Sequence, residues 1–168
     1  YGFQTNGIFQ NLAEIDAYKS ADGALIQPNA LPGDFKWKDI NGDGTITNDD
    51  RTFLGSNLPK IVYGITLNLD YKSFDMMIFA QGAAGNKIFQ GLRRLDIGNA
   101  NFQTEALSRW TGEGSSNTFP RLTSNDTNGN FSRMSDFYLE DGAYTRLKLV
   151  QLGYTMPASW SGKISSSK

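Results

Sequence analysis

The feature that most constrains the fold is an alternation of side-chain character over residues 61–71. Every odd position is apolar or aromatic, and most even positions are small or polar; the odd series is Ile61, Tyr63, Ile65, Leu67, Leu69 and Tyr71. Successive side chains of a strand point to opposite faces, so the pattern predicts a strand with one apolar face. Soluble strands average about 5 to 6 residues, whereas a tilted membrane strand needs roughly 9 to 11. The length therefore favours a membrane strand.

A second strand is predicted directly after the first. Lys72 and Ser73 permit a tight turn, and residues 74–81 return with apolar side chains on one face. Tyr63 and Tyr71 lie toward the two ends of the first strand's apolar face, which is typical of the aromatic girdles of a membrane barrel. A long hairpin in a soluble sandwich would give the same alternation, so the pattern by itself leaves both interpretations open.

A third long strand is predicted near the end of the chain. A turn at residues 141–142 precedes residues 144–156, and Pro157 ends the strand. The apolar side chains occupy odd positions up to Leu149 and even positions from Val150 onward. A β-bulge at this point would bring both halves of the apolar pattern to one face of the sheet.

The composition excludes several classes of function. The chain has 168 residues and contains neither Cys nor His, which removes disulfides, thiolate chemistry and the commonest general base. With 16 Lys and Arg against 17 Asp and Glu, it has no basic excess for binding nucleic acid. Acidic pairs at 49–50 and 140–141 resemble the carboxylates of a glycosidase, but adjacent acids in a strand point to opposite faces. We therefore predict that the chain is not an enzyme.

The segment before the first long strand is predicted to be an external loop, residues 1–60. A short surface helix is expected over residues 11–19, with Asn11 as the N-cap and Glu14 in the capping-box position. A Pro- and Gly-containing connector follows, and residues 35–38 read as a short strand.

A second long connection is predicted over residues 83–140, with a helix expected around 103–110. A structureless stretch of this length is unusual inside a compact soluble domain, but it is normal on the outer side of a membrane barrel. No run of about 20 apolar residues predicts a membrane helix. Because Tyr1 is not Met and residues 165–168 contain no closing element, we expect a segment of a longer protein.

Residues 39–50 match the loop that binds calcium in EF-hand proteins. Oxygen ligands are expected from its first, third, fifth, seventh and twelfth positions, which are Asp39, Asn41, Asp43, Thr45 (through its carbonyl) and Asp50. Gly44 at the sixth position permits the sharp turn. The twelfth position carries Asp where Glu is usual, and no convincing helix flanks the loop. We predict a lone structural site for Ca²⁺; an Asx-rich turn that binds no metal is the alternative.

Short motifs recur along almost the whole chain, at residues 1–10, 32–44, 50–52, 55–57, 59–60, 79–82, 109–111, 120–122, 139–148 and 152–157. The most extensive are Pro-Gly-Asp-Phe-Lys-Trp-Lys-Asp-Ile-Asn-Gly-Asp-Gly and Leu-Glu-Asp-Gly-Ala-Tyr-Thr-Arg-Leu-Lys. In this order and combination the motifs resemble the late part of SusC/RagA-type TonB-dependent outer-membrane proteins.

The resemblance implies a fold, a location and partners. Members of the family form barrels of about 22 strands with an N-terminal plug, in the outer membrane of Bacteroidetes-type bacteria. They import oligosaccharides or peptides with energy delivered through TonB, and a SusD-like lipoprotein covers the outer mouth. This chain would then hold antiparallel strands of a partial transmembrane β-barrel (61–82 and 141–157) with long extracellular loops. Its partners would be the rest of the barrel, the lipoprotein, and TonB through a plug that this segment lacks.

Three aromatic residues are candidates for contact with substrate or lid: Trp37, Trp110 and Phe119. Aromatic rings stack on sugars, although packing within the loops is the more common role of such residues. A second hypothesis for the whole chain is a soluble, calcium-stabilised carbohydrate-binding β module, which would use the same loop and the same aromatic residues.

Overall fold

The computed structural model describes residues 1–94, 97 and 101–158, so the predicted chain end at 165–168 lies outside the described residues. The chain divides into two compact units. We call Tyr1–Gly55 with Ile88–Glu140 the loop unit. We call Ser56–Lys87 with the described residues from Asp141 onward the sheet unit.

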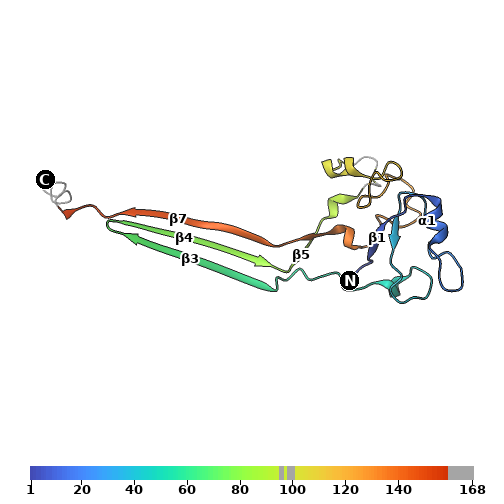
Figure 1. Ribbon diagram of the computed structural model, residues 1–168, viewed down its shortest axis with the longest axis horizontal. Helices are drawn as coiled ribbons and strands as arrows, with labels where there is room; N and C mark the ends of the chain where they lie inside the picture. Colours follow the sequence, from blue (N-terminus) through green and yellow to red (C-terminus); the bar gives the residue numbers. More distant parts are fainter. Residues whose placement is uncertain (95–96, 98–100, 159–168) are drawn as a thin grey trace. The chain divides into compact units, whose positions relative to one another are not determined.

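The sheet unit consists of three long antiparallel strands in the order β3-β4-β7 (Figure 1). β3 covers Ile61–Tyr71, β4 covers Phe74–Ala84 and β7 covers Tyr144–Tyr154. The alternation therefore predicted β3 residue for residue, whereas β4 runs further than expected and β7 ends earlier. Lys72, with a φ of 56°, makes the tight turn between the first two strands.

The predicted β-bulge is present in β7. Phe79 pairs with Leu149, whereas the next residue of β4, Ala80, pairs with Leu147, which leaves Lys148 as the extra residue. Directly paired residues of antiparallel strands point to the same face. The bulge therefore places Leu147 on the same face as Val150, and the switch in the sequence pattern becomes continuous in space.

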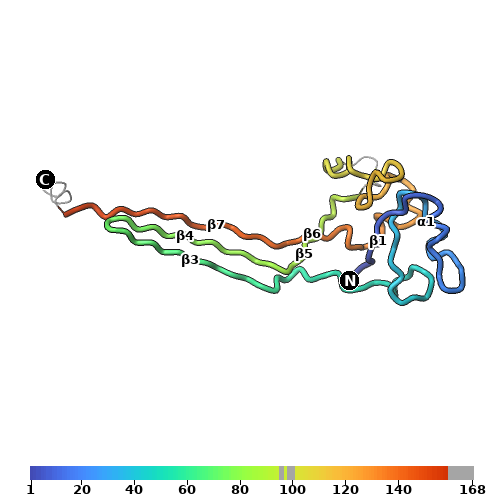
Figure 2. The backbone as a smooth tube through the Cα atoms, viewed as in Figure 1, coloured from blue at the N-terminus to red at the C-terminus, as the bar shows by residue number. Residues whose placement is uncertain are grey.

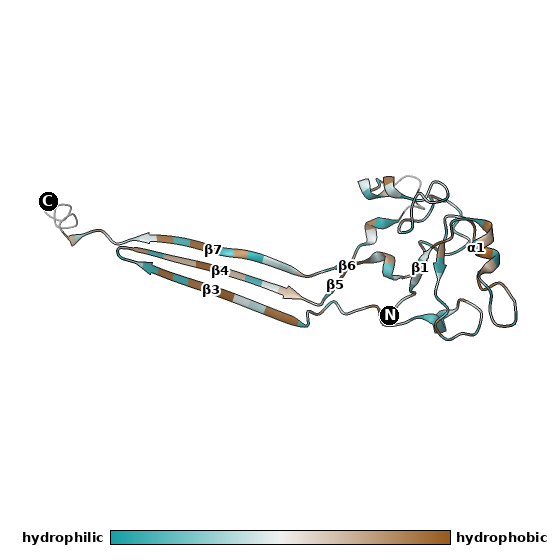
Figure 3. Cartoon of the chain, in the orientation of Figure 1, coloured by the Kyte–Doolittle hydropathy of each residue, from teal (hydrophilic) through white to brown (hydrophobic). Residues whose placement is uncertain are grey.

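The pairing divides the side chains of the sheet between two unlike faces. The apolar face carries Ile61, Tyr63, Ile65, Leu67, Leu69, Tyr71, Phe74, Met76, Ile78, Ala80, Leu147, Val150, Leu152 and Tyr154. The opposite face, which we call the mixed face, includes Thr66, Asn68, Asp70, Asp75, Gln81, Arg146 and Gln151. Figure 3 shows the resulting alternation of hydrophobic and hydrophilic residues along the strands. Apolar-face side chains are exposed: Ile65 at 63% and Leu152 at 71%.

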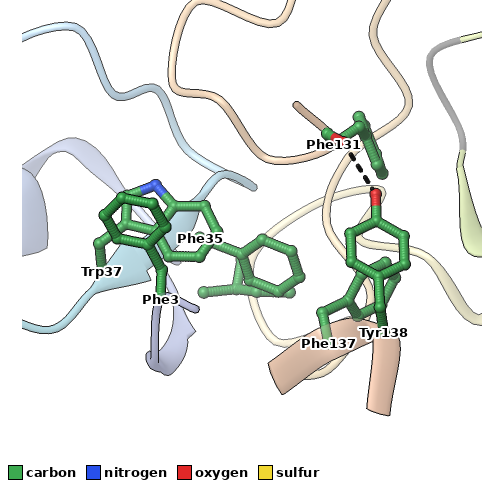
Figure 4. Close-up of a cluster of buried hydrophobic side chains, with 7 residues drawn as sticks. Phe3, Phe35, Trp37, Phe131, Phe137 and Tyr138 are labelled. Carbon is green, nitrogen blue, oxygen red and sulfur yellow. Dashed lines mark hydrogen bonds between the residues drawn. The ribbon is translucent and has the colours of Figure 1, made fainter. Parts of the chain in front are cut away.

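The loop unit has a core of its own, built mainly from aromatic residues. Strand β1 (Thr5–Ile8) pairs antiparallel with β2 (Phe35–Trp37), and this small sheet supplies part of the core. The buried cluster consists of Phe3, Ile8, Phe35, Trp37, Phe131, Phe137 and Tyr138, most of which Figure 4 shows. The Tyr138 hydroxyl donates to the Phe131 carbonyl oxygen at 3.0 Å. The two long segments predicted as separate loops therefore share one core.

The loop unit contains one α-helix among its described residues, α1 (Leu12–Ala17). Its N-cap is Asn11, whose side chain accepts a hydrogen bond from the Glu14 N–H at 3.0 Å, as the sequence predicted. The helix is shorter than the predicted span of residues 11–19. None of the helices in the described ranges is long and apolar enough to cross a membrane.

The remaining elements are short. β5 (Lys87–Phe89) pairs with β6 (Leu139–Asp141), as the backbone tube in Figure 2 shows. The 3₁₀ helices are η1 (Asn48–Asp50), η2 (Gly91–Arg93), η3 (Thr104–Ser108) and η4 (Asp136–Tyr138). The helix expected at 103–110 is thus a 3₁₀ turn. The prediction of an antiparallel β fold with little helix is confirmed, and the described strands do not close into a barrel.

Candidate functional site

The first part of the predicted calcium loop is a turn in which carboxylates accept hydrogen bonds from backbone N–H groups. The two Asp39 oxygens accept from Gly42 N–H at 2.7 Å and from Gly44 N–H at 2.8 Å. Both glycines have positive φ, 76° and 81°, which the sharp turn requires. The Asn41 amide donates to Asp43 at 2.8 Å, and the Thr45 N–H and hydroxyl both donate to it at 2.9 Å. These bonds, the one from Asn41 first, lower the pKa of Asp43.

The last residue of the loop, Asp50, is fully buried and binds backbone rather than side chains. Its Oδ1 accepts from the Ile40 N–H at 2.8 Å, and its Oδ2 accepts from the Thr47 N–H at 2.7 Å. The Thr47 hydroxyl oxygen in turn accepts from the Asp49 N–H at 3.2 Å. The bonds that join Thr47 to Asp49 and Asp50 form a capping box at the start of η1.

The five predicted ligands are therefore only partly brought together. Asp39, Asn41 and Asp43 lie in one turn, whereas both Asp50 oxygens already have backbone partners. Within the described ranges no group of three acidic side chains is arranged to hold a metal ion. Asp50 would complete a five-ligand site for Ca²⁺ either through the lone pairs that its two backbone partners leave open or by giving up those partners.

Of the three candidate aromatic residues, Trp37 lies in the core of the loop unit. It is 1% exposed, and its indole N–H donates to the Asn128 carbonyl oxygen at 3.0 Å. Its ring centroid lies 5.4 Å from that of Phe35 and 5.9 Å from that of Phe3. This burial favours the packing alternative for Trp37.

The other two aromatic residues are half-buried and pack against the same core. The Trp110 indole N–H donates to Gln10 at 3.1 Å, and the ring covers Gly33 so closely that a Cβ there would lie 2.4 Å from it. Phe119 packs edge-on against Phe137, with ring centroids 5.2 Å apart. The structure therefore gathers the three predicted aromatic residues around one core rather than in a row on the surface.

A buried polar network in the loop unit escaped the sequence analysis. Asp34, with no exposed surface, accepts from Asn130 at 2.8 Å and from the Arg121 guanidinium at 2.6 Å. The side-chain oxygen of Asn130, Oδ1, accepts from the Phe35 N–H and from the Asn128 side-chain amide. Residues 125–130 lie within the connection that the sequence predicts to be an external loop. Nothing in the local sequence distinguishes an Asn that binds a distant strand from one that faces water.

A cavity of ≈520 Å³ in the loop unit was also missed. Its lining includes Arg51 and Arg133 beside residues 46–48, the second half of the predicted calcium loop. No sequence signal pairs two arginines that lie so far apart along the chain, so the cavity emerges only from the folded structure.

Comparison with known proteins shows that the chain is similar to part of several TonB-dependent receptors. No protein-family model matches it. It is 34% identical over 164 residues to TonB-dependent receptor P26 of Formosa agariphila, covering 96% of this chain and 16% of that protein. TonB-dependent receptor P3 of the same organism is 31% identical over 97% of the chain and 15% of its own length. TonB-dependent receptor SusC of Bacteroides thetaiotaomicron is 24% identical over 81% of the chain and 13% of its own length.

Proposed function

Because the chain belongs to the SusC-like family of TonB-dependent receptors, we propose that it supplies wall strands and outer loops to an outer-membrane nutrient importer. The chain spans about a sixth of the length of the curated relatives it matches. Import would therefore be an activity of a larger assembly, to which this chain contributes a part of the barrel and of its external surface.

The observation that carries this proposal is the three-stranded sheet with one apolar and one mixed face. Each strand has 11 residues, and at about 3.3 Å per residue it is about 36 Å long. A strand of that length tilted by about 45° rises about 25 Å, which is the height of the apolar band of a membrane barrel. Lipid would cover the apolar face, and the mixed face would line the interior.

The ends of the strands and the edges of the sheet agree with this position. Phe74 and Tyr154 have ring centroids 4.8 Å apart, and both are paired neighbours at the strand end where Tyr71 lies. Aromatic residues gather in this way at the membrane interface. β3 and β7 each have one edge without a strand partner among the described residues. Backbone groups at such edges must be paired inside lipid, so further strands of the same barrel would complete them.

The proposal includes partners and a class of cargo. Energy would come from TonB, a SusD-like lipoprotein would cover the outer mouth, and the cargo would be an oligosaccharide or a peptide. The family relationship to a receptor named SusC supports these assignments. The compact loop unit, which has its own core, is a suitable folded surface for contacts with the lid.

Cysteine labelling along β3 tests the membrane position. The chain contains no Cys, so single Leu67→Cys and Asn68→Cys changes, made in the complete receptor with any other cysteines replaced, can be probed with a water-soluble maleimide in outer-membrane vesicles. We expect Asn68→Cys to react and Leu67→Cys to remain protected until detergent is added. Equal reaction at both positions would contradict a lipid-facing position for Leu67.

We also propose that the loop at residues 39–50 binds Ca²⁺ as a structural ion. The supporting observation is the turn that holds Asp39, Asn41 and Asp43 together around two glycines of positive φ. Such clustered hard oxygens suit Ca²⁺. Asp50 would then either join the site or stay as the buried cap of η1.

Calorimetric titration of Ca²⁺ into the metal-stripped chain tests this second proposal. We expect binding that is lost in Asp39→Ala and retained in Asp22→Ala, a control change at an exposed Asp outside the loop. Absence of heat at millimolar Ca²⁺ would identify the loop as a turn closed by its own backbone hydrogen bonds.

A further inference from the structure

The cavity beside residues 46–48 is lined by two guanidinium groups and by no acidic side chain. Arg51 and Arg133 supply the charge. Thr47, Asn48 and Ser132 supply polar groups, and Met134 lies on its apolar side. Its volume, ≈520 Å³, falls within the range of roughly 300–1,000 Å³ that small-molecule sites occupy. Both the size and the charge of the cavity therefore suit a small anionic group.

Arg133 is held in place largely by aromatic rings. Its guanidinium lies 4.8 Å from the Phe3 ring centroid and 5.8 Å from that of Trp37. It donates to the Ile46 carbonyl oxygen at 3.5 Å and makes no ion pair with a described residue. A guanidinium has five N–H donors in a fixed plane, so most of them stay available to a ligand.

Two carboxylates near Arg133 stabilise its charge without occupying its donors. Burial lowers the pKa of Arg133, and the charges of Asp50 and Asp126 oppose that shift. The Asp50 oxygens accept from backbone N–H groups in the calcium-type loop. The Asp126 oxygens accept from the N–H groups of residues 130–132. An anion that enters the cavity would therefore displace no existing ion pair.

Arg51 and the neutral side chains complete the lining. Arg51 is exposed, donates to the Tyr1 carbonyl oxygen at 3.2 Å, and makes no ion pair within the described ranges. The side chains of Asn48 and Ser132 make no hydrogen bond within the part of the chain that the structure describes. They offer donors and acceptors suited to the hydroxyl groups of a sugar ring.

We propose that this cavity is a subsite for an acidic sugar, whose carboxylate or sulfate group binds between Arg51 and Arg133. Arginine matches the planar geometry of a carboxylate with paired hydrogen bonds, and it also binds sulfate oxygens well. Met134, which lines the cavity and is 39% exposed, supplies apolar surface for the ring, and the neutral polar side chains bind its hydroxyl groups. This inference rests on the proposed import function and specifies the class of oligosaccharide that the loop unit would contact.

Titration of the full chain in detergent with four small probes tests the subsite, with the amide resonances of residues 132–134 as the readout. Glucuronate carries a carboxylate and glucose 6-sulfate carries a sulfate, each on a glucose-type ring. Glucose has the ring without an anionic group, and N-acetylaspartate has carboxylates without a sugar. We expect one or both acidic sugars to bind and glucose to bind at least about tenfold more weakly. Equal binding of glucose, equal binding of N-acetylaspartate, or no binding of either acidic sugar would overturn the proposal.

Three matched substitutions locate the site. Arg51→Gln and Arg133→Gln should each raise the Kd of the acidic sugar about tenfold or more, whereas Arg146→Gln, on the sheet unit, should leave it unchanged. Arg51 is exposed, so its variant keeps the test valid if Arg133→Gln disturbs packing. An unchanged Kd in Arg51→Gln would refute the subsite. The labelling pattern at Leu67 and Asn68 does not depend on this cavity, so either proposal can fail without the other.

Discussion

The loop unit and the sheet unit treat apolar side chains in opposite ways. The seven residues of the loop unit's core are each at most 8% exposed, with Phe35 at 2% and Trp37 at 1%. In the sheet unit, on the apolar face, Leu147 is 61% exposed and Leu152 is 71% exposed. A contiguous exposed apolar surface marks a site that something else covers. The loop unit thus folds around its own core, whereas the sheet unit exposes an apolar face that lipid would cover under the proposed function.

The same contrast holds for polar groups. The loop unit buries Asp34 and Asn130 completely, and each finds partners inside the unit. The sheet unit instead places its polar side chains, such as Asn68 and Gln151, on the mixed face opposite the apolar one. A buried polar group must be hydrogen-bonded within the protein, but a polar group that lines an aqueous interior needs no internal partner. Under the proposed function, the two units would therefore be adapted to different solvents.

The strongest test of this contrast is Phe35→Ala in the loop unit. Phe35 packs against Trp37 and Phe137, with ring centroids 5.4 and 5.0 Å away. Its removal leaves a cavity that should cost about 3–5 kcal/mol of the loop unit's stability. Hydrogen exchange in detergent should then show faster exchange throughout the loop unit and unchanged protection in β3 and β4. The matched change Ile65→Ala should have little effect, and equal loss from both would contradict the division into two kinds of core.

A charge placed on either face of β3 tests the sheet unit in the same way. Leu67→Arg would place a guanidinium on the apolar face, where its cost in lipid is about 2–4 kcal/mol at mid-depth. Asn68→Arg, one residue away, would place it on the mixed face at little cost. The amount of heat-resistant receptor in outer membranes is the measurement. A similar fall for both variants would argue against a lipid-facing surface.

Much of the sheet could be predicted because its signals are local. The alternation over residues 61–71 predicted β3, and the shift of the apolar pattern at residues 149–150 predicted the bulge that the structure shows at Lys148. The core of the loop unit could not be predicted, because its contacts join distant segments that have no periodicity. Thr5, for example, belongs to no periodic sequence pattern, yet its N–H donates to the Asp136 carboxylate at 3.1 Å, 131 residues away along the chain.

The candidate sites were predictable only in part for a related reason. The spacing of residues 39–50 indicated the turn, but the same side chains satisfy either a metal ion or the backbone. Asp50 shows the difficulty, since its two oxygens bind the Ile40 and Thr47 N–H groups. The orientation of a carboxylate is decided by how the loop packs, and the sequence does not contain that information in a local form.

The polar network offers a more moderate test of the loop unit. Asn130→Ala would leave the buried Phe35 N–H without its side-chain partner, which should cost about 1–3 kcal/mol. It would also remove one hydrogen bond to Asp34, whose Oδ1 keeps its bond from Arg121. Chemical denaturation followed by Trp fluorescence would report the loss. Asn125→Ala is the matched control, because the Asn125 side chain is exposed and makes no hydrogen bond within the described residues. Equal stability of the two variants would show that the network does not hold the unit together.

The smallest expected effect concerns the capping box at η1, where the calcium-type loop ends. Thr47→Ala removes the oxygen that accepts from the Asp49 N–H and should cost about 1 kcal/mol. Thr47→Ser keeps that oxygen and should retain most of the stability, while Asp50 keeps its own two bonds in both variants.

Thermal unfolding with and without Ca²⁺ separates two roles of the segment. If Asp50 serves only as a cap, the cost of Thr47→Ala should be the same in both conditions. If Ca²⁺ draws Asp50 away from the Thr47 N–H, the capping box is already broken in the ion-bound state, and the variant should cost less when the ion is present.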